Sequence, residues 1–480
     1  MSAVGAIGTP PSESSVPRKW WALAFLVTGN LTVFTAVTMM NVAIPQAQAA
    51  LEFADSTRAS VVTLYSLCFG TFMLLAGRLA DAFGLRRCLC AGLAGFAVAS
   101  ALGGLAPSIQ VLLVARATQG IAGALVAAST LALLSVMFPE GRPRVRAFGL
   151  YGMAMGMGAA ASFSLAGALV SSMSWRWVML IDTPIALAVM LGVIGFASAP
   201  TATATQASRL RLGSAVLISI ALGLLVVGLD RAGAHGWNHG PAGILMGSGV
   251  LLIGGFVFAL RRSRDPLIPL FLLSDRRRLS AFSAVFLTGI GVFAGMFILT
   301  ALLQTTLGYP PLLTGAAFLP WGLSAVAAAQ LLGSITTRLS FDMTLAVGLL
   351  MIAVAMASLS LLRPDSAYAT GILPAMLLFG AGSTIVMVAG TSTATLNAGQ
   401  HSGIAGALVN ASQQLGAALG TALLAAVITA TIQNQPGNSS SLTGYATGSG
   451  FGAILIGLGA IGAMALARMR RRAPAPGDRT

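Results

Sequence analysis

The sequence predicts an all-α polytopic membrane protein with fourteen transmembrane helices. Of its 480 residues, 56% are hydrophobic and only 8% carry a charge, and the mean hydropathy is +0.87. An average soluble domain has about 25% charged residues. The hydrophobic residues are sufficient for roughly a dozen spans of about 20 residues each. This composition excludes a soluble enzyme and a disordered or fibrous chain.

Long apolar segments recur along the whole chain, each close to the length that a bilayer requires of a helix. They lie at residues 20–44, 59–80, 88–106, 109–132, 145–170, 177–198, 212–230, 241–260, 281–304, 311–335, 343–362, 369–393, 404–432 and 447–467. Glycine is abundant, with 57 residues. Small-residue spacings such as Gly152-x3-Gly156 and Gly416-x3-Gly420 therefore indicate close helix packing.

The positive charges predict the orientation of these spans. Of the 27 Lys and Arg residues, 22 lie in the tails and the even-numbered loops, four lie in odd-numbered loops, and one, Arg116, lies inside a span. Because cytoplasmic loops carry the excess of Lys and Arg, both termini are expected in the cytoplasm, with the protein in the cell membrane. A net charge of +15 suggests nucleic acid in a soluble protein, but this placement of the charges removes that partner.

The two longest breaks in the apolar pattern divide the chain into six, two and six spans. The expected organisation is a cytoplasmic N-terminal tail (1–19), a six-helix bundle (20–198), a linker with two extra helices and an Arg-rich cytoplasmic loop (199–280), a second six-helix bundle (281–467) and a basic cytoplasmic tail (468–480). Residues 77–87 and 333–342 each follow the second helix of a bundle and are faintly alike. This indicates pseudo-symmetric halves, as in many secondary transporters.

Several motifs resemble the major facilitator superfamily. GRLADAFGLRR (Gly77–Arg87) resembles its cytoplasmic loop signature, and LLVARATQGIAGA (Leu112–Ala124) resembles the fourth-helix signature of its drug–proton antiporters. Four further segments resemble the fourteen-helix drug:proton antiporter-2 branch: NVAIP (Asn41–Pro45), SWRWVMLIDTP (Ser174–Pro184), LLQTTLGYPPLLTG (Leu302–Gly315) and SGIAGALVNASQQLGAALG (Ser402–Gly420). The resemblance covers about residues 20–467 and implies a multidrug or antibiotic exporter.

The loop after the second span contains residues suited to a conformational latch. Gly77 lets two helix ends approach, and Gly84 permits a tight turn. The carboxylate of Asp81, near a helix N-terminus and with Arg86 and Arg87 as partners, can stabilise one closed state. The resemblance implies such a latch, and the alternative is a solvated turn that only follows the positive-inside bias.

Arg116 is the single basic residue in the interior of a predicted span, away from the span ends. It lies some seven residues from the start of the fourth span, which is about 10 Å at 1.5 Å per residue. A guanidinium at this depth is costly unless it pairs or lines a wet cavity. The resemblance assigns this position to proton coupling or to holding the carboxylate that couples protons. The alternative is an anchor that extends to the outer interface.

The acidic residue that would partner Arg116 is not at the position that the resemblance implies. Relatives usually carry an acid five positions before the Asn of the NVAIP segment, and here that position is Ala36. Asp182 and Asp230 are the acids nearest to the membrane, both toward outer helix ends on the side of Arg116. Because burial and a nearby cation both change how readily a carboxyl group holds a proton, we expect Asp182 to couple protons with Arg116. The alternative is a carboxylate with a structural role only.

The fifth span also differs from the family pattern. It lacks the usual Gly-Pro pair and reads Ser-Phe-Ser-Leu-Ala-Gly at 162–167. Since a proline kinks a helix, we expect this span to be straighter, or kinked in another way, than in relatives.

The expected substrate cavity is apolar and sparsely polar. Methionine adapts to irregular ligands and suits loose selectivity, and amide side chains can orient a ligand. The candidate lining residues are Phe34, Met40, Asn41, Gln119, Met155, Phe163, Gln304, Asn410, Gln413 and Gln414. Any single methionine can instead face lipid or a neighbouring helix. Because the predicted cavity contains no acid, neutral, weakly acidic or zwitterionic lipophilic compounds are favoured over strongly cationic ones.

These observations predict a secondary active transporter that exports lipophilic small molecules by alternating access in exchange for protons. We expect it to be monomeric, with no cofactor and no metal, since His235 and His239 flank glycine in a turn-like loop. Two alternatives stay open, an uncoupled facilitator of the same fold and a non-transporting sensor. An intramembrane enzyme would need reactive groups that converge at depth, whereas the His, Asp and Glu residues lie outside the span interiors.

Overall fold

The structure, a computed structural model, describes residues 15–54, 57–138, 141–196, 212–236, 240–262, 270–363, 366–396, 402–434 and 440–472. All regular elements within these ranges are helices, which confirms the predicted all-α class. An apolar bilayer favours this choice, because a helix satisfies its backbone hydrogen bonds within one segment.

The helices follow one another with short connections. The first seven are α1 (Ser15–Leu51), α2 (Arg58–Phe83), α3 (Leu85–Gly104), α4 (Ile109–Met137), α5 (Gly141–Ser172), α6 (Trp177–Leu180) and α7 (Asp182–Phe196). The next three are α8 (Leu212–His235), α9 (Gly240–Arg262) and α10 (Leu270–Ser274). The last group comprises α11 (Arg276–Ala301), the π-helix η2 (Leu302–Thr306), α12 (Pro311–Ala317), α13 (Leu319–Arg338), α14 (Phe341–Ser360), the π-helix η3 (Tyr368–Ile372), α15 (Leu373–Thr395), α16 (Ser402–Asn434) and α17 (Ser440–Arg472).

Eleven helical stretches of the described chain are long and apolar enough to cross a membrane. The predicted spans at 59–80, 145–170 and 212–230 fall on α2, α5 and α8, which are helices of 26, 32 and 24 residues but are not among the eleven. The structure therefore describes a multi-pass membrane protein, and the count of fourteen spans stays a prediction. Residues 141–172 form one helix, α5, and its straightness relative to the family stays a prediction.

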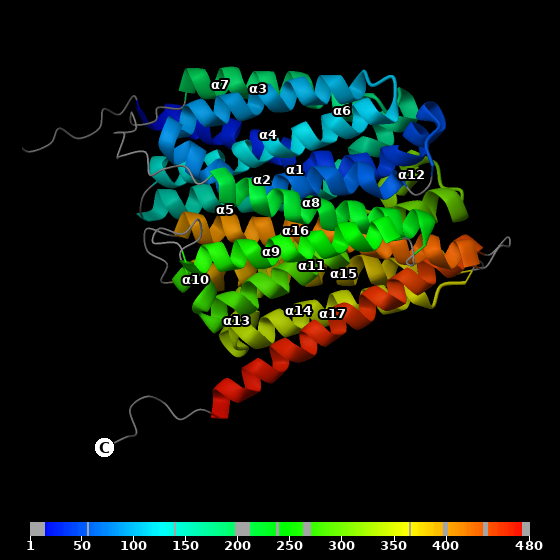
Figure 1. Ribbon diagram of the computed structural model, residues 1–480. Helices are drawn as coiled ribbons and strands as arrows, with labels where there is room; N and C mark the ends of the chain where they lie inside the picture. The colour runs from blue at the N-terminus through cyan, green and yellow to red at the C-terminus, as the bar shows by residue number, and fades with distance from the viewer. Residues whose placement is uncertain are drawn as a thin grey trace, which may run out of the picture.

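The long helices lie side by side in one bundle (Figure 1). Within the first group, α4 packs against both α2 and α3, and α1 packs against α5 and α7. Within the last group, α14 packs against α15 and α17, and α11 packs against α16. The two groups meet where α2 packs on α16 and where α5 packs on α12 and α13.

Helix α8 covers one of these seams. It contacts α2 of the first group and α16 of the last, and its other main neighbour is α9. Leu222, Val226 and Leu229 of α8 form a small apolar cluster with Leu67 and Ala418. The face of α9 turned away from the bundle exposes large apolar side chains, as expected of a lipid-facing surface.

The two ends of the bundle differ in charge. At one end, where α1 begins and α2 ends, the side chains of Arg18, Arg86, Arg87 and Arg144 gather; we call this the basic end. Arg18 and Arg86 donate there to the last carbonyls of α7, at Gly195 and Ile194. Cations at these carbonyls satisfy hydrogen-bond acceptors that a helix leaves open.

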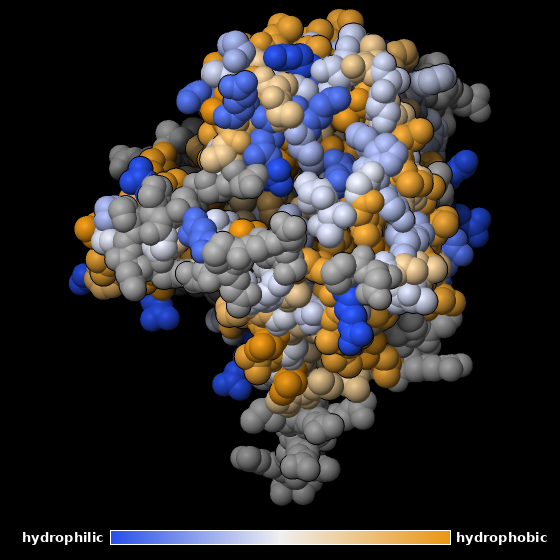
Figure 2. Space-filling model, turned by 90° about the vertical axis from the view of Figure 1, so that its right-hand side faces the viewer, coloured by the Kyte–Doolittle hydropathy of each residue, from blue (hydrophilic) through white to orange (hydrophobic). Residues whose placement is uncertain are grey.

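At the other end, called the far end here, α1 and α5 finish and α2 and α12 begin. Figure 2 looks onto this end, where blue and pale side chains lie among orange ones.

Candidate functional site

Arg116 lies completely inside the first group of helices, with none of its surface exposed. Its Nε donates to the carbonyl of Val61 on α2 at 3.0 Å, and its Nη1 donates to the carbonyl of Ala36 on α1 at 3.2 Å. The guanidinium also lies over the ring of Tyr65, 4.5 Å from its centroid. One cation therefore contacts three helices, which does not fit an anchor that extends to the membrane surface.

Gln119 links this cation to Asp182. Its Oε1 accepts from Arg116 Nη1 at 2.8 Å, and its Nε2 lies 2.9 Å from Ser100 Oγ and 3.5 Å from Asp182 Oδ2. Asp182 is 2% exposed, and Gln119 is fully buried. The arrangement holds a cation and a carboxyl group in one buried network with an amide between them.

Local sequence explains how these side chains meet. Residues 116 and 119 are three apart on α4 and therefore lie on one face of that helix. Asp182 is the first residue of α7, directly after a turn that separates it from α6. Buried Trp175 anchors the loop before α6 to α1, because its backbone N–H donates to Gln46 Oε1 at 2.6 Å. Arg176 donates to the carbonyls of Gly104, the last residue of α3, and of Ala106 just beyond it.

The network also contacts Ala36, where the resemblance implies an acid. Ala36 is 3% exposed, and its carbonyl oxygen, not a carboxylate, accepts from Arg116. The carboxyl group of the network comes instead from α7, through Asp182. One Arg116 nitrogen, Nη2, has no hydrogen-bond partner among the described residues. This nitrogen can therefore donate to a further acceptor, such as a rearranged carboxylate or a water molecule.

The structure places the predicted latch residues at the basic end without bringing them all together. Gly84 ends α2 with φ at +96°, a conformation that favours glycine, and Gly77 has open space where a side chain would lie. Arg86 binds the carbonyl of Ile194, and Arg87 is exposed. The side chain of Asp81 lies outside the described part of the structure, so the latch stays a prediction.

The predicted cavity residues of α1 and α5 lie within the first group or at its contact with the last. Met40 and Asn41 are buried, and Phe34 is half-buried with its ring 6.3 Å from that of Phe69. Met155 is half-buried, and its sulfur accepts from Asn30 Nδ2 at 3.4 Å.

Phe163 takes part in the contact between the two groups. Its ring stacks on Phe318 at 4.0 Å between centroids. Nearby, Ser164 Oγ donates to the Gly315 carbonyl at 3.3 Å, and the N–H of Leu312 donates to Ser171 Oγ at 3.1 Å. These contacts join α5 to α12 and α13 at the far end, so this side of the interface is closed in the structure.

The predicted amides of the last group point in different directions. Gln304 lies in η2 and donates to the Val42 carbonyl of α1 at 3.2 Å, so it bridges the two groups. Asn410 donates to Gly406 of its own helix at 3.4 Å, and Gln413 is half-buried. Gln414 is 3% exposed and its Oε1 has no partner among the described residues. The structure does not gather all of the predicted amides into one site.

Sequence reasoning missed two polar partners inside the bundle. Ser100 completes the bonds of Gln119, and Tyr65 donates to the Val33 carbonyl at 2.6 Å while it supports Arg116. A hydroxyl inside an apolar span is the signal that could have marked each of them. Within the described ranges, no group of three or more His, Cys, Asp or Glu residues could hold a metal ion. His239 lies outside those ranges.

The fold is a multi-pass helical bundle, and a cation, an amide and a carboxyl group form a buried network between its helices. These features indicate the class of membrane transport proteins. Comparison with known proteins gives the family. The profile of the Major Facilitator Superfamily matches residues 26–421, and the chain belongs to this family of transporters. It is therefore a transporter and not an enzyme.

Its relatives include antibiotic exporters. The chain is 39% identical to the puromycin resistance protein pur8 of Streptomyces alboniger, covering 88% of this chain and 85% of the relative. It is 32% identical to the cephamycin export protein CmcT of Amycolatopsis lactamdurans, covering 93% and 92%. A solved structure of a POT family transporter in complex with a thioalcohol-conjugated peptide shares the fold at a TM-score of 0.68, with 14% identity over 93% of this chain and 96% of that one.

Proposed function

We propose that this protein exports lipophilic small molecules, antibiotics among them, by alternating access in exchange for protons. The observation that carries this proposal is the buried network of Arg116, Gln119 and Asp182. Its relatives support the choice of substrate, because they are named for resistance to or export of puromycin, cephamycin and tetracenomycin C.

In this proposal the chain forms two six-helix bundles, residues 20–198 and 281–467, joined by a linker with two extra helices at 199–280. The basic end faces the cytoplasm, because Lys and Arg gather on that side of membrane proteins. The closed contact of α5 with α12 then lies on the outer side, and the substrate enters from the cytoplasm. Opening of that contact, with closure of the basic end, releases the substrate outside.

Asp182 is the proposed proton carrier. A carboxyl group that is buried beside a cation changes its charge when that cation moves or when water reaches it. When Asp182 gains a proton, it loses the negative charge that Gln119 Nε2 faces and that Arg116 balances through Gln119. Because Arg116 is bonded to carbonyls of α1 and α2, this change reaches both helices directly. Helix α2 packs on α16 and α1 bonds to Gln304, so both helices contact the last group.

Ala36 favours one alternative, an uncoupled facilitator of the same fold. In that case Asp182 serves only to balance the buried Arg116. The two functions differ in one respect, since a facilitator moves drug without responding to a proton gradient.

The first test is resistance in a drug-sensitive host that expresses the chain. The probes are puromycin, a cephamycin and tetracenomycin C, with intracellular drug measured alongside growth. We expect reduced accumulation of at least one probe with the wild-type chain, and loss of that effect with Asp182→Asn at equal membrane abundance. Asp182→Glu, which keeps the carboxyl group, is the matched control and should keep part of the activity. Unchanged accumulation of every probe by the wild-type chain would refute the export proposal.

A further inference from the structure

Helices α8 and α9 lie side by side and pack closely on each other (Figure 1). A methyl group at Gly249 of α9 would collide with the Ala221 carbonyl of α8, and one at Gly228 of α8 would collide with Met246 of α9. Glycines at such positions let two helix backbones approach closely in a membrane. The two helices therefore form one unit, which we call the α8–α9 pair.

The apolar contact of this pair is made mostly with the last group. Leu222, Val226 and Leu229 of α8 are buried in a small cluster at the seam between the groups. Helix α16 of the last group contributes to this cluster Leu415, Ala418, Leu419, Ala422 and Leu423. Among the described residues, α2 of the first group contributes Leu67 alone. Because apolar stabilisation grows with the area that is buried, this cluster holds α8 more firmly on α16 than on α2.

The segment that follows the pair is also fixed to the last group. Leu272 of α10 has no exposed surface, and the ring of Phe271 lies 5.5 Å from the guanidinium of Arg278 on α11. Arg278 is itself buried, and its Nη2 donates to the Leu396 carbonyl at the end of α15 at 2.9 Å. Helices α11 and α15 both belong to the last group, so Arg278 joins α10 to that group.

The chain connections of the pair differ in length in the same sense. Seven residues, 263–269, separate α9 from α10, whereas fifteen residues, 197–211, separate α7 of the first group from α8. The longest possible reach is about 25 Å for the first connection and about 50 Å for the second. The pair is therefore tethered more closely to the last group.

We infer that the α8–α9 pair is a strap that is fixed to the last group and slides on α2 during transport. Apolar contacts have no fixed direction, so the contact with Leu67 permits such sliding. The strap keeps the seam between α2 and α16 covered while the two groups move. The inference rests on the proposed function, because it requires alternating access.

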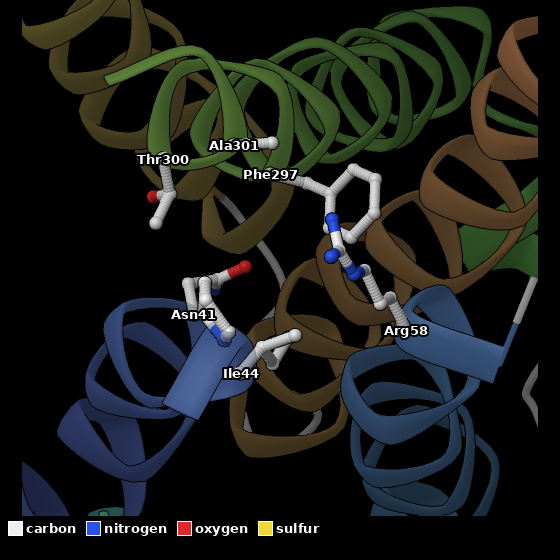
Figure 3. A pocket seen from close by; sticks show the side chains of 7 residues that line it. Asn41, Ile44, Arg58, Phe297, Thr300 and Ala301 are labelled. Carbon is white, nitrogen blue, oxygen red and sulfur yellow. The ribbon is translucent and has the colours of Figure 1, made fainter. Parts of the chain in front are cut away.

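The far end is a suitable place to measure this movement. There Asn41 of α1 and Arg58 of α2 face Phe297 and Thr300 of α11 across a small space (Figure 3). Opening of the far end separates these helices. Labels at this end therefore report how far each part of the molecule moves.

The test measures three distances by pulsed electron paramagnetic resonance on the purified full-length chain without its native cysteines. Spin labels are attached at exposed positions near the far end, taken two at a time: Leu105→Cys after α3, Ile244→Cys on α9 and Leu361→Cys after α14. The far end is opened by Gly315→Ala, because a methyl group there would collide with the Phe163 carbonyl. No drug is needed for this step.

We expect Gly315→Ala to shift the distance from Leu105 to Leu361, which joins the two groups. The distance from Ile244 to Leu105 should shift as well, whereas the distance from Ile244 to Leu361 should stay unchanged. Gly223→Ala is the matched control and should shift none of the three, since a methyl group there meets nothing within 4 Å.

A shift of the distance from Ile244 to Leu361 would overturn the strap. Failure of alternating access gives a different result, in which the distance from Leu105 to Leu361 stays the same in Gly315→Ala and on addition of puromycin, and the strap is then refuted with it. If Gly315→Ala does not fold, Gly167→Ala disturbs the same contact from α5, and the same pattern of shifts is expected.

Discussion

Arg116 and Asp182 are two opposite charges buried in the same group of helices, and each depends on the other. Both lie within bonding distance of Gln119, and both are essentially unexposed. Removal of one partner leaves the other as an uncompensated buried charge, which usually costs about 3–5 kcal/mol. Removal of both can be nearly neutral for the folded state.

A double substitution should therefore separate stability from transport. Arg116→Leu should lower the melting temperature of the purified protein and abolish drug efflux. Addition of Asp182→Asn to that variant should restore most of the melting temperature, because no charge is then left unpaired, but should not restore efflux. The measurements are thermal unfolding in detergent and drug accumulation in cells. Full efflux by the double variant would exclude this pair from the mechanism.

Gln119 provides the finest test at the residue scale. Gln119→Leu keeps the side-chain size but removes both the acceptor for Arg116 and the donor for Asp182. We expect drug efflux driven by a proton gradient to fall at least tenfold. Efflux at the wild-type rate would show that the amide does not connect the two charges. Thr118→Val, one position away with an exposed hydroxyl that bonds only within its helix, is the control.

At the scale of helices, the contact of α5 with α12 depends on two glycines. A methyl group at Gly167 would collide with the Pro311 carbonyl, and one at Gly315 would collide with the Phe163 carbonyl. Glycine thus permits two backbones to approach closely, as at many helix interfaces in membranes. Closure of the far end requires this approach.

Gly315→Ala should therefore hold the far end partly open. The measurement is labelling of a single cysteine, Ser164→Cys, at a half-buried position of this contact, by a membrane-impermeant maleimide in a background without Cys68, Cys88 and Cys90. We expect labelling to rise several-fold and drug efflux to fall. Gly223→Ala is the matched control, since a methyl group there meets nothing within 4 Å. Equal labelling of the two variants would contradict this view of the closed end.

At the scale of the whole molecule, α8 lies across the seam between the two groups. It contacts α2 and α16 at once, through the apolar cluster around Leu222 and Val226. Alternating access requires the two groups to move relative to each other. A helix that packs on both must shift on at least one of them during each cycle.

The sequence predicted most of the fold because membrane helices leave a direct signal in hydropathy and charge. The predicted segment at 109–132 matches α4, and 404–432 matches α16, within a few residues at most ends. Other details depend on packing and have no local signal. The π-helix that contains Gln304 is of this kind, because Gln304 bonds to the Val42 carbonyl of the distant helix α1.

The candidate site was predictable in part. Arg116 stood out since it is a lone cation in an apolar span, and Asp182 since the usual acid is replaced by Ala36. The role of Ser100 and the pairing of Phe163 with Phe318 could not be predicted, because they depend on how distant helices meet.

Proton coupling is the central claim, and one measurement tests it most directly. Purified protein is reconstituted in liposomes that contain a drug to which the chain confers resistance, and drug movement is recorded with and without an imposed pH gradient. The account predicts that the gradient accelerates drug transport by the wild-type chain, with matching proton movement, and that Asp182→Asn abolishes this response. Equal transport rates with and without the gradient would contradict it and would leave an uncoupled facilitator.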